Sequence, residues 1–262
     1  MAQAPFQDNV VILTGASRGI GEQLAYQLAD QGASLALAAR GLERLEEVAA
    51  RCRQRGGKAL AVQTDVTDES QCQRLIERAV EFYGRVDTLL NDAGMGYPRR
   101  FEALPDLSHL KAEMELNYYG LVHCVFHALP HLKQTKGRLV AVSSFGGLIG
   151  IPGTIGYNSS KHALQGFLDT LRAELRGSGV SVTVVCPGAI RTARLEQTMG
   201  ANIDKIPTML PERCAQIIVQ QAARRKRQYV LTASGKTMVW IEKLAPSLAD
   251  RILASVPISY EE

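Results

Sequence analysis

The chain has 262 residues, of which 46% are hydrophobic and 21% are charged, as in an ordinary globular protein. Its formal net charge of +4 is too small to predict nucleic-acid binding. The N-terminal residues lack the pattern of a secretory signal, and no run of about 18 apolar residues predicts a membrane-spanning helix. Five cysteines without paired spacing predict buried thiols in a reducing compartment, the cytoplasm, rather than disulfides or a zinc site. They are Cys52, Cys72, Cys124, Cys186 and Cys214.

Short apolar segments alternate with amphipathic helical patterns along the chain. The apolar segments predict strands at 10–14, 34–39, 58–64, 86–90, 139–143, 180–186 and 229–232. Helical spacing of apolar residues follows most of them, first through Leu24 and Leu28, then at 42–52, 72–83, 107–132, from Tyr157 onward, and at 211–224. Strands that alternate with helices and are apolar on both faces predict an α/β protein with a helix-covered parallel sheet.

Functional side chains of such a sheet lie at the carboxyl ends of its strands. The residues at these positions are Gly15, Arg40, Asp65, Asn91, Ser144 and Pro187. After the first strand, Thr14 and Gly15 open a glycine-rich turn that continues through Gly19 and Gly21. A glycine turn between a strand and a helix exposes backbone N–H groups to a phosphate at the positive end of the helix dipole. We therefore favour phosphate binding over a plain connecting turn.

A second cluster surrounds the fifth predicted strand. Ser144 follows this strand, and Tyr157 and Lys161 stand four residues apart at the start of a helical pattern. Residues with this spacing share one helix face, so a phenol and an ammonium group lie side by side. We expect the positive charge to lower the pKa of the phenol, which suits a proton donor or acceptor near neutrality.

In this order and spacing, these motifs resemble the short-chain dehydrogenase/reductase family. The resemblance is carried by Thr14, Gly15, Gly19, Gly21, Asn91, Ala93, Gly94, Asn117, Ser144, Tyr157, Lys161, Pro187 and Gly188. It implies a Rossmann-type, doubly wound, seven-stranded parallel sheet, a single domain over 1–262 and a nicotinamide cofactor. The apolar residues after Ser234 resemble the C-terminal helical extension of the hydroxysteroid dehydrogenase and carbonyl reductase branch, which we place at 233–262.

The resemblance also implies a role for each residue of a catalytic tetrad. Tyr157 would exchange a proton with the substrate oxygen, and Lys161 would lower the pKa of Tyr157 and bind the nicotinamide ribose. Ser144 would hold the substrate oxygen, and Asn117 would hold a water on a proton path. The implied cofactor-binding residues are Gly15, Ser17, Arg18, Gly19, Ile20, Gly21, Arg40, Asp65, Val66, Asn91, Ala93, Gly94, Tyr157, Lys161, Pro187, Gly188, Ile190 and Thr192.

Two arginines, one after the second strand and one in the glycine turn, predict NADP(H) rather than NAD(H) as the cofactor. An acid at this position binds a ribose 2′-hydroxyl, whereas a basic residue accommodates a 2′-phosphate. Arg40 occupies the position and Arg18 lies in the glycine turn, so two guanidinium groups are available to one phosphate. The alternative is that both are solvated surface residues. Asp92 departs from the asparagine that the family carries, and a carboxylate accepts hydrogen bonds but cannot donate them.

The predicted substrate is a lipophilic ketone or secondary alcohol, because the segment 193–210, which we take as a lid, is rich in apolar residues. A ketoacyl reductase of lipid synthesis and an NADP(H)-binding regulatory protein remain alternatives. We expect a homodimer or homotetramer, and we favour a subunit contact over membrane contact for the C-terminal extension. His123, His127 and His131 lie on one helix face, where we favour a subunit contact over a metal site.

Overall fold

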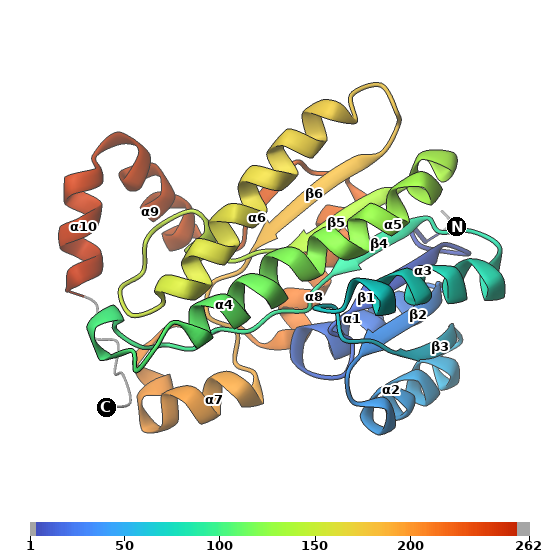
Figure 1. Cartoon of the computed structure of the whole chain (residues 1–262), viewed down its shortest axis with the longest axis horizontal. Coiled ribbons are helices and arrows are strands. Elements are labelled where there is room, and N and C mark those ends of the chain that lie inside the picture. Colours follow the sequence, from blue (N-terminus) through green and yellow to red (C-terminus); the bar gives the residue numbers. More distant parts are fainter. Residues whose placement is uncertain (1–3, 256–262) are drawn as a thin grey trace.

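The computed structural model describes residues 4–255, apart from the side chains of 201, 202 and 205. These residues form one seven-stranded parallel sheet in the order β3-β2-β1-β4-β5-β6-β7 (Figure 1). The strands are β1 (Val10–Thr14), β2 (Ser34–Ala39), β3 (Lys58–Gln63), β4 (Thr88–Asn91), β5 (Arg138–Val142), β6 (Ser181–Cys186) and β7 (Gln228–Val230). The order reverses between β1 and β4, as in a doubly wound sheet. The predicted Rossmann-type fold class is confirmed.

Helices cover both faces of the sheet. The α-helices are α1 (Gly19–Ala29), α2 (Leu42–Gln54), α3 (Glu69–Tyr83), α4 (Ser108–Met114), α5 (Gly120–Thr135), α6 (Ile155–Glu174), α7 (Ala193–Met199), α8 (Pro211–Ala223), α9 (Ala233–Leu244) and α10 (Pro246–Ala254). Shorter turns are the 3-10 helices η1 (Phe101–Ala103), η3 (Phe145–Gly147) and η4 (Gly200–Lys205), and the π-helix η2 (Glu115–Tyr119).

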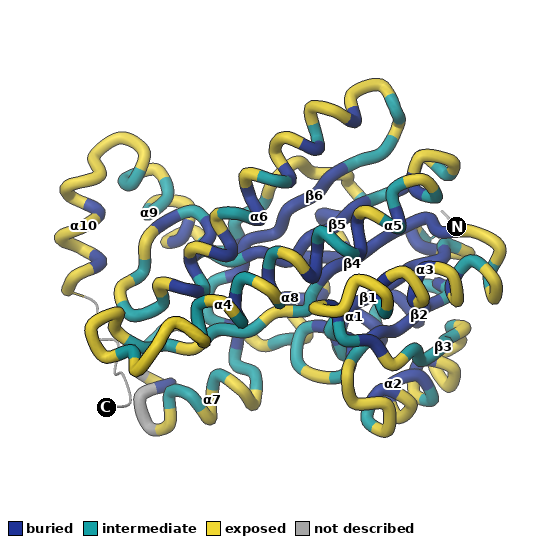
Figure 2. The backbone as a smooth tube through the Cα atoms, viewed as in Figure 1, coloured by how far each residue is buried: buried dark blue, intermediate teal, exposed yellow. Residues whose placement is uncertain are grey.

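Two apolar clusters, one on each face, form the core. Helices α1, α2 and α8 pack on one face through residues such as Leu24, Leu45 and Ile218. Helices α3, α5 and α6 cover the other face through residues such as Leu75 and Leu164. Figure 2 shows the inner strands β1, β2, β4, β5 and β6 as mostly buried, whereas the edge strands β3 and β7 are more exposed. Full burial of one such side chain contributes about 1.5–3 kcal/mol, so these two layers hold the strand ends in place.

The helix predicted at 107–132 is interrupted. It consists of α4, the π-helical turn η2 and α5, and it continues past Pro130 to Thr135. A π-helical turn inside an α-helix is rare and is often found at functional sites. Here the turn contains Asn117, which the family resemblance placed in the tetrad.

Candidate active site

The glycine turn after β1 is too tight for side chains. Gly15 and Gly19 have φ angles of 72° and 59°, which favour glycine. A Cβ atom on Gly15 would lie 2.7 Å from the Ala93 nitrogen, and one on Gly21 would lie 2.2 Å from the Gly15 oxygen. The turn therefore packs against the end of β4 and leaves backbone groups at the N-terminus of α1. Ser17 and Ile20 lie in the same turn and in the first turn of the helix.

The end of β4 is tied to the end of β1. The Thr14 hydroxyl donates a 2.9 Å hydrogen bond to Asn91 Oδ1 and accepts one from the Ala93 N–H at 3.3 Å. Asn91 Nδ2 is buried and has no hydrogen-bond partner among the described residues. This amide group is one that a bound molecule at the carboxyl edge of the sheet can satisfy.

Two of the predicted cofactor residues, Asp65 and Val66, follow β3. Asp65 accepts hydrogen bonds from the backbone and the hydroxyl of Thr67, at 3.0 and 2.8 Å. Asp68, not Asp65, caps α3 by accepting the Gln71 N–H. Val66 is 5% exposed, and its carbonyl oxygen lies 3.1 Å from His123 Nδ1. An acid just before a helix often serves only to cap it, but here Asp68 has that role. The contact of Asp65 with a cofactor stays a prediction.

Ser144, Tyr157 and Lys161 converge beside the end of β5. The Ser144 hydroxyl neighbours the phenol of Tyr157 and acts to lower its pKa, and it accepts the Gly146 N–H at 3.1 Å. Lys161 Nζ donates to the Val142 carbonyl at 3.1 Å and lies 5.7 Å from the centre of the Tyr157 ring. The structure thus brings together a hydroxyl, a phenol and an ammonium group at one strand end.

The protonation of this cluster differs from the sequence-based expectation. Burial raises the pKa of Tyr157 above its usual value, and the neighbouring Ser144 hydroxyl opposes this only in part. Burial also lowers the pKa of Lys161, to about 8, although the charge of Asp92 opposes that shift. Desolvation, which the sequence does not reveal, is the largest cause of both shifts.

Asn117 completes the cluster through the loop after β4. Its Oδ1 accepts the Met95 N–H at 2.8 Å, and its Nδ2 donates to the Met95 oxygen at 2.8 Å and to Ser160 Oγ at 2.9 Å. Ser160 donates in turn to the Tyr157 carbonyl at 2.7 Å. The predicted role of Asn117 in holding a water stays a prediction. Sequence reasoning missed Ser160, although it directly precedes Lys161.

The segment after β6 closes over the glycine turn. The Pro187 carbonyl accepts the Phe145 N–H at 2.8 Å, which joins this segment to Ser144. Thr192 caps α7 by accepting the Leu195 N–H at 3.2 Å. A Cβ atom on Gly19 would lie 3.1 Å from the Thr192 methyl group. Gly188 and Ile190 lie on the same segment, so the structure brings these predicted residues to the same strand edge.

The sequence matches the profile of the family described as "short chain dehydrogenase" over residues 9–202. This chain belongs to the short-chain dehydrogenase family. It is therefore an oxidoreductase, as predicted. "11-beta-hydroxysteroid dehydrogenase 1A" of Arabidopsis thaliana is 37% identical over 260 residues, which cover 92% of this chain and 73% of the relative. "11-beta-hydroxysteroid dehydrogenase A" of Sesamum indicum is 32% identical over 255 residues, with coverages of 92% and 73%.

A solved structure has the same fold as this dehydrogenase. It is a short chain dehydrogenase from Burkholderia cenocepacia J2315 in complex with NADP, with a TM-score of 0.83 and 24% sequence identity. The similarity covers 96% of this chain and 99% of that one. The curated relatives above confirm the predicted resemblance to the hydroxysteroid dehydrogenase branch.

The segment 193–210, predicted to be a lid, is attached to the residues after β6. Arg191 donates to Glu196 at 3.0 Å and to Asp204 at 2.9 Å. Ile203 is 5% exposed and packs inward, whereas Leu210 is 61% exposed. Leu210, the last residue of the predicted lid, lines a surface pocket with residues of α1 and α8.

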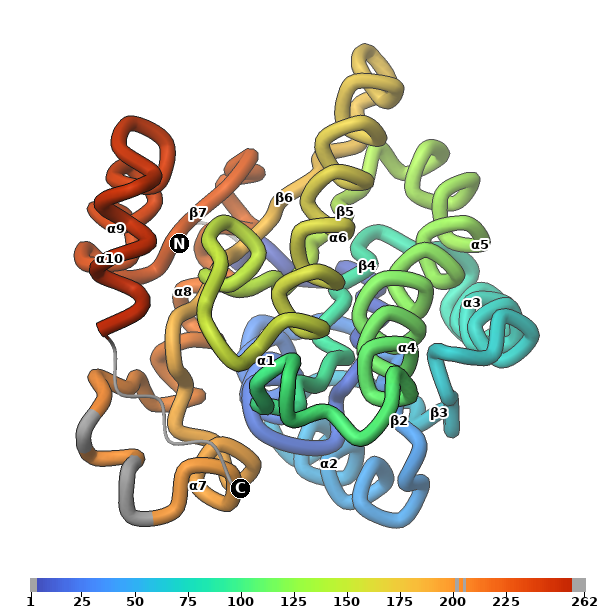
Figure 3. Tube along the Cα trace, turned by 60° about the vertical axis from the view of Figure 1, so that its left-hand side comes forward, coloured from blue at the N-terminus to red at the C-terminus, as the bar shows by residue number. Residues whose placement is uncertain are grey.

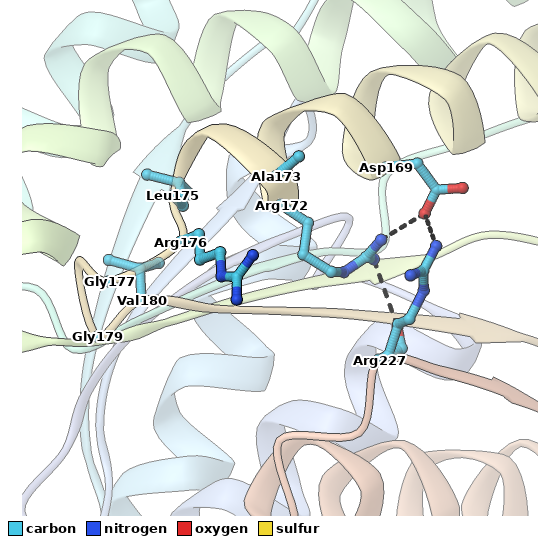
Figure 4. A pocket seen from close by; sticks show the side chains of 9 residues that line it. All are labelled: Asp169, Arg172, Ala173, Leu175, Arg176, Gly177, Gly179, Val180 and Arg227. Carbon is cyan, nitrogen blue, oxygen red and sulfur yellow. Dashed lines mark hydrogen bonds and ion pairs between the residues drawn. The ribbon is translucent and has the colours of Figure 1, made fainter.

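A pocket at the far end of α6 is separate from the tetrad. Asp169 accepts hydrogen bonds there from Arg172 and Arg227, and it lies about 18 Å along the helix from Tyr157 (Figure 4). Gly179 and Arg227 line it just before β6 and β7 begin, so it lies at the amino edge of the sheet. The tetrad lies at the carboxyl edge, and this pocket is not the candidate active site.

The histidine face of α5 packs within the chain. His123 contacts Val66, and His127 Nε2 lies 3.4 Å from Glu69 Oε1 of α3. These contacts hold the two histidines within the chain, and the predicted subunit contact through this helix face stays a prediction. No group of residues suited to a metal ion occurs within the described part of the chain. All five cysteines are free and buried, as predicted.

Helices α9 and α10 form the C-terminal extension beside β7 (Figure 3). Trp240 and Leu244 are 63% and 78% exposed, so much of the apolar surface of α9 faces outward. Within residues 4–255, none of the helices has both the length and the hydrophobicity that crossing a membrane requires. The predicted contact of this extension with a second subunit stays a prediction.

Proposed function

We propose that this dehydrogenase uses NADP(H) to interconvert a lipophilic ketone and the corresponding secondary alcohol. The observation that carries the proposal is the convergence of Ser144, Tyr157, Lys161 and Asn117 beside the glycine turn at one edge of the sheet. The names of the Arabidopsis and Sesamum relatives support a lipophilic hydroxyl or carbonyl substrate. The similar fold solved with NADP supports the cofactor.

The chain fits a dinucleotide. The glycine turn leaves backbone N–H groups at the N-terminus of α1 free of side-chain cover, and the helix dipole there favours a pyrophosphate. Asn91 Nδ2 is a buried donor without a partner among the described residues. Arg18 and Arg40 are exposed near the ends of β1 and β2, where a 2′-phosphate would require positive charge. When bound, the nicotinamide would supply or accept the hydride.

Tyr157 would act as the proton donor in the reductive direction. Its raised pKa keeps the phenol protonated at neutral pH, which a donor to a carbonyl oxygen requires. The Ser144 hydroxyl, which neighbours the phenol, would bind the same substrate oxygen. For alcohol oxidation the phenol must first lose its proton, so we expect the chain to oxidise alcohols better as the pH rises.

We further propose that apolar residues of the predicted lid and of the loop after β5 bound the substrate site. Ile203 and Ile149 are 5% and 1% exposed, and both are bulky and apolar. Apolar walls with a few polar groups at one point favour a large hydrophobic substrate whose single oxygen reaches Ser144 and Tyr157. We further propose that the chain works as a homodimer or homotetramer.

The deciding experiment is a fluorescence titration with NADPH and NADH, followed by NADPH oxidation with a panel of hydrophobic ketones and one ketoacyl thioester. We expect tighter binding of NADPH and turnover of ketones. The variant Tyr157→Phe should bind NADPH like the wild type and lose turnover, because only the proton donor is removed. Tight binding without any turnover would instead support a regulatory NADP(H)-binding protein, and turnover of the thioester alone would support a ketoacyl reductase.

A further inference from the structure

Glu113 is a buried carboxylate that the tetrad does not include. It lies on α4, is 1% exposed, and precedes Asn117 by one helical turn on the same face. Burial of an acid in a largely apolar helix contact destabilises the fold unless the carboxylate is hydrogen-bonded, so its contacts indicate what it does.

The first contact is with the loop after β4. Glu113 Oε1 accepts the Tyr97 N–H at 2.8 Å. Asn117 makes two 2.8 Å hydrogen bonds with the backbone of Met95, two residues earlier. One helix face therefore holds this loop, residues 95–97, at both ends.

The second contact is with the helix that carries Tyr157. A Cβ atom on Gly156 would lie 2.1 Å from Glu113 Oε2, so the carboxylate rests directly on the first turn of α6. Thr154, the N-cap of this helix, makes no side-chain capping bond. Negative charge at a helix N-terminus is favourable, so Glu113 is well placed to stabilise this turn.

The loop itself lies against the phenol ring. A Cβ atom on Gly96 would lie 3.0 Å from Tyr157 Cδ2, which means that the loop backbone forms one wall of the phenol site. Any movement of the loop changes the space that the Tyr157 ring occupies. Glu113 holds the loop with one oxygen and touches the residue before Tyr157 with the other.

Charged neighbours from the surrounding elements face this carboxylate. Burial raises the pKa of Glu113, while the Tyr97 N–H and the positive charge of Arg194 oppose the rise. Arg194, from the lid helix α7, donates to the Gly96 carbonyl at 3.4 Å and lies 5.7 Å from the centre of the Tyr97 ring. His109 of α4 lies 4.7 Å from the same ring. Glu113 also raises the pKa of Tyr157 through its charge.

We propose that Glu113 is a positioning residue that clamps the loop 95–97 against the first turn of α6 and so fixes the Tyr157 phenol for proton transfer to the substrate. The role in proton transfer rests on the proposed function, whereas the clamp is a property of the fold. The loop in turn supports the lid through Arg194, so the clamp also connects the lid to the site of proton transfer.

Hydrogen–deuterium exchange tests the clamp without any need for turnover. The full-length variants are Glu113→Ala, Glu113→Gln and, as control, Glu115→Gln, which changes an exposed acid two residues away. We expect the Tyr97 amide to exchange about tenfold faster in Glu113→Ala, as after the loss of one hydrogen bond of ordinary net strength. Glu113→Gln keeps an acceptor oxygen and should retain slow exchange, as should the control. Equal exchange at Tyr97 in all variants and the wild type would overturn the clamp.

Kinetics then test its consequence for proton transfer. We expect Glu113→Ala to lower kcat for ketone reduction by about tenfold to a hundredfold while NADPH affinity stays unchanged. Glu113→Gln should restore most of kcat, and the pH at which ketone reduction declines should move downward, because the negative charge that raises the Tyr157 pKa is gone. A purely structural residue would instead lower the melting temperature and NADPH affinity in both variants without moving the pH profile. If the wild type reduces no ketone, the proposed function fails, and the exchange measurement still decides on the clamp.

Discussion

Asp92 places a carboxylate beside the glycine turn, at a position where the family carries asparagine. A Cβ atom on Gly21 would lie 2.9 Å from its Oδ2, so the carboxylate lies against the first turn of α1. Burial raises the pKa of Asp92 to about 8, although the charge of Lys161 and the backbone N–H of Gly21 both oppose the rise. The missing donor of an asparagine is thus replaced by a carboxyl group that takes up a proton readily.

Replacing this acid should change how stability depends on pH. Because the pKa in the fold, about 8, lies above the ordinary value of 3.8, the folded chain binds this proton more tightly than the unfolded chain. The protonated Asp92 therefore stabilises the fold fully below about pH 3.8, the pKa in the unfolded chain. This stabilisation is lost as the pH rises through about 8, the pKa in the folded chain. Asp92→Asn removes this dependence, so its stability relative to the wild type should increase with pH. Urea unfolding of both proteins between about pH 5 and pH 9 measures the difference, and parallel curves would contradict the assignment.

Arg40 should decide between the two nicotinamide cofactors. A basic residue after β2 suits a 2′-phosphate, whereas an acid there binds the 2′-hydroxyl and repels the phosphate. We expect Arg40→Asp to shift the ratio of NADPH to NADH affinity by about tenfold or more toward NADH, equivalent to about 1.4 kcal/mol. Arg74→Asp makes the same charge change at an exposed position on α3 and should leave the ratio unaltered. Equal ratios in the two variants would rule out Arg40 as the phosphate partner.

At the scale of single elements, the turn between β1 and α1 depends on the absence of side chains. A Cβ atom on Gly21 would lie 2.2 Å from the backbone oxygen of Gly15, which cannot move without displacing the end of β1. We expect Gly21→Ala to lower the free energy of unfolding by about 1–3 kcal/mol and to weaken cofactor binding, because the turn must widen.

A second glycine provides the matched control. Gly166 lies within α6 with nothing within 4 Å of a Cβ atom placed on it. Gly166→Ala should therefore raise the free energy of unfolding by about 0.5–1 kcal/mol, since alanine favours the helix interior. Chemical unfolding of both variants measures the two effects, and a stable Gly21→Ala variant with normal cofactor affinity would contradict the steric argument.

The elements that the sequence predicts well are those with local signals. Apolar runs and spaced glycines depend on neighbouring residues, so β1, β2 and the turn at Gly15 match their predictions. The π-helical turn and the carboxylate of Glu113 escape prediction, because both depend on contacts with the loop 95–97 rather than on local spacing. Burial explains the error at Tyr157 and Lys161: the sequence reveals their shared helix face, but not how far the fold removes both from water.

At the scale of the whole molecule, exposed aromatic residues mark one outer surface. Tyr119 and Phe126, on η2 and α5, are 43% and 69% exposed, and Figure 1 shows α5 in the helix layer in front of the sheet. Large aromatic side chains stabilise protein contacts most when they are buried at the centre of an interface. The surface around Phe126 is thus the most exposed apolar part of α5 and is available to a second subunit.

The oligomer should therefore depend on Phe126. We expect the wild type to have a mass that is a multiple of 28.5 kDa in solution, and Phe126→Asp to shift it to the monomer, because a charge at this position would have to be desolvated in the contact. Phe82→Asp places the same charge at an exposed aromatic residue of α3 and should leave the mass unchanged. Light scattering after size-exclusion chromatography measures the mass, and NADPH affinity checks that each variant is folded. A wild-type monomer would refute the proposed assembly, whereas an oligomer that survives in Phe126→Asp would place the contact on another face of the molecule.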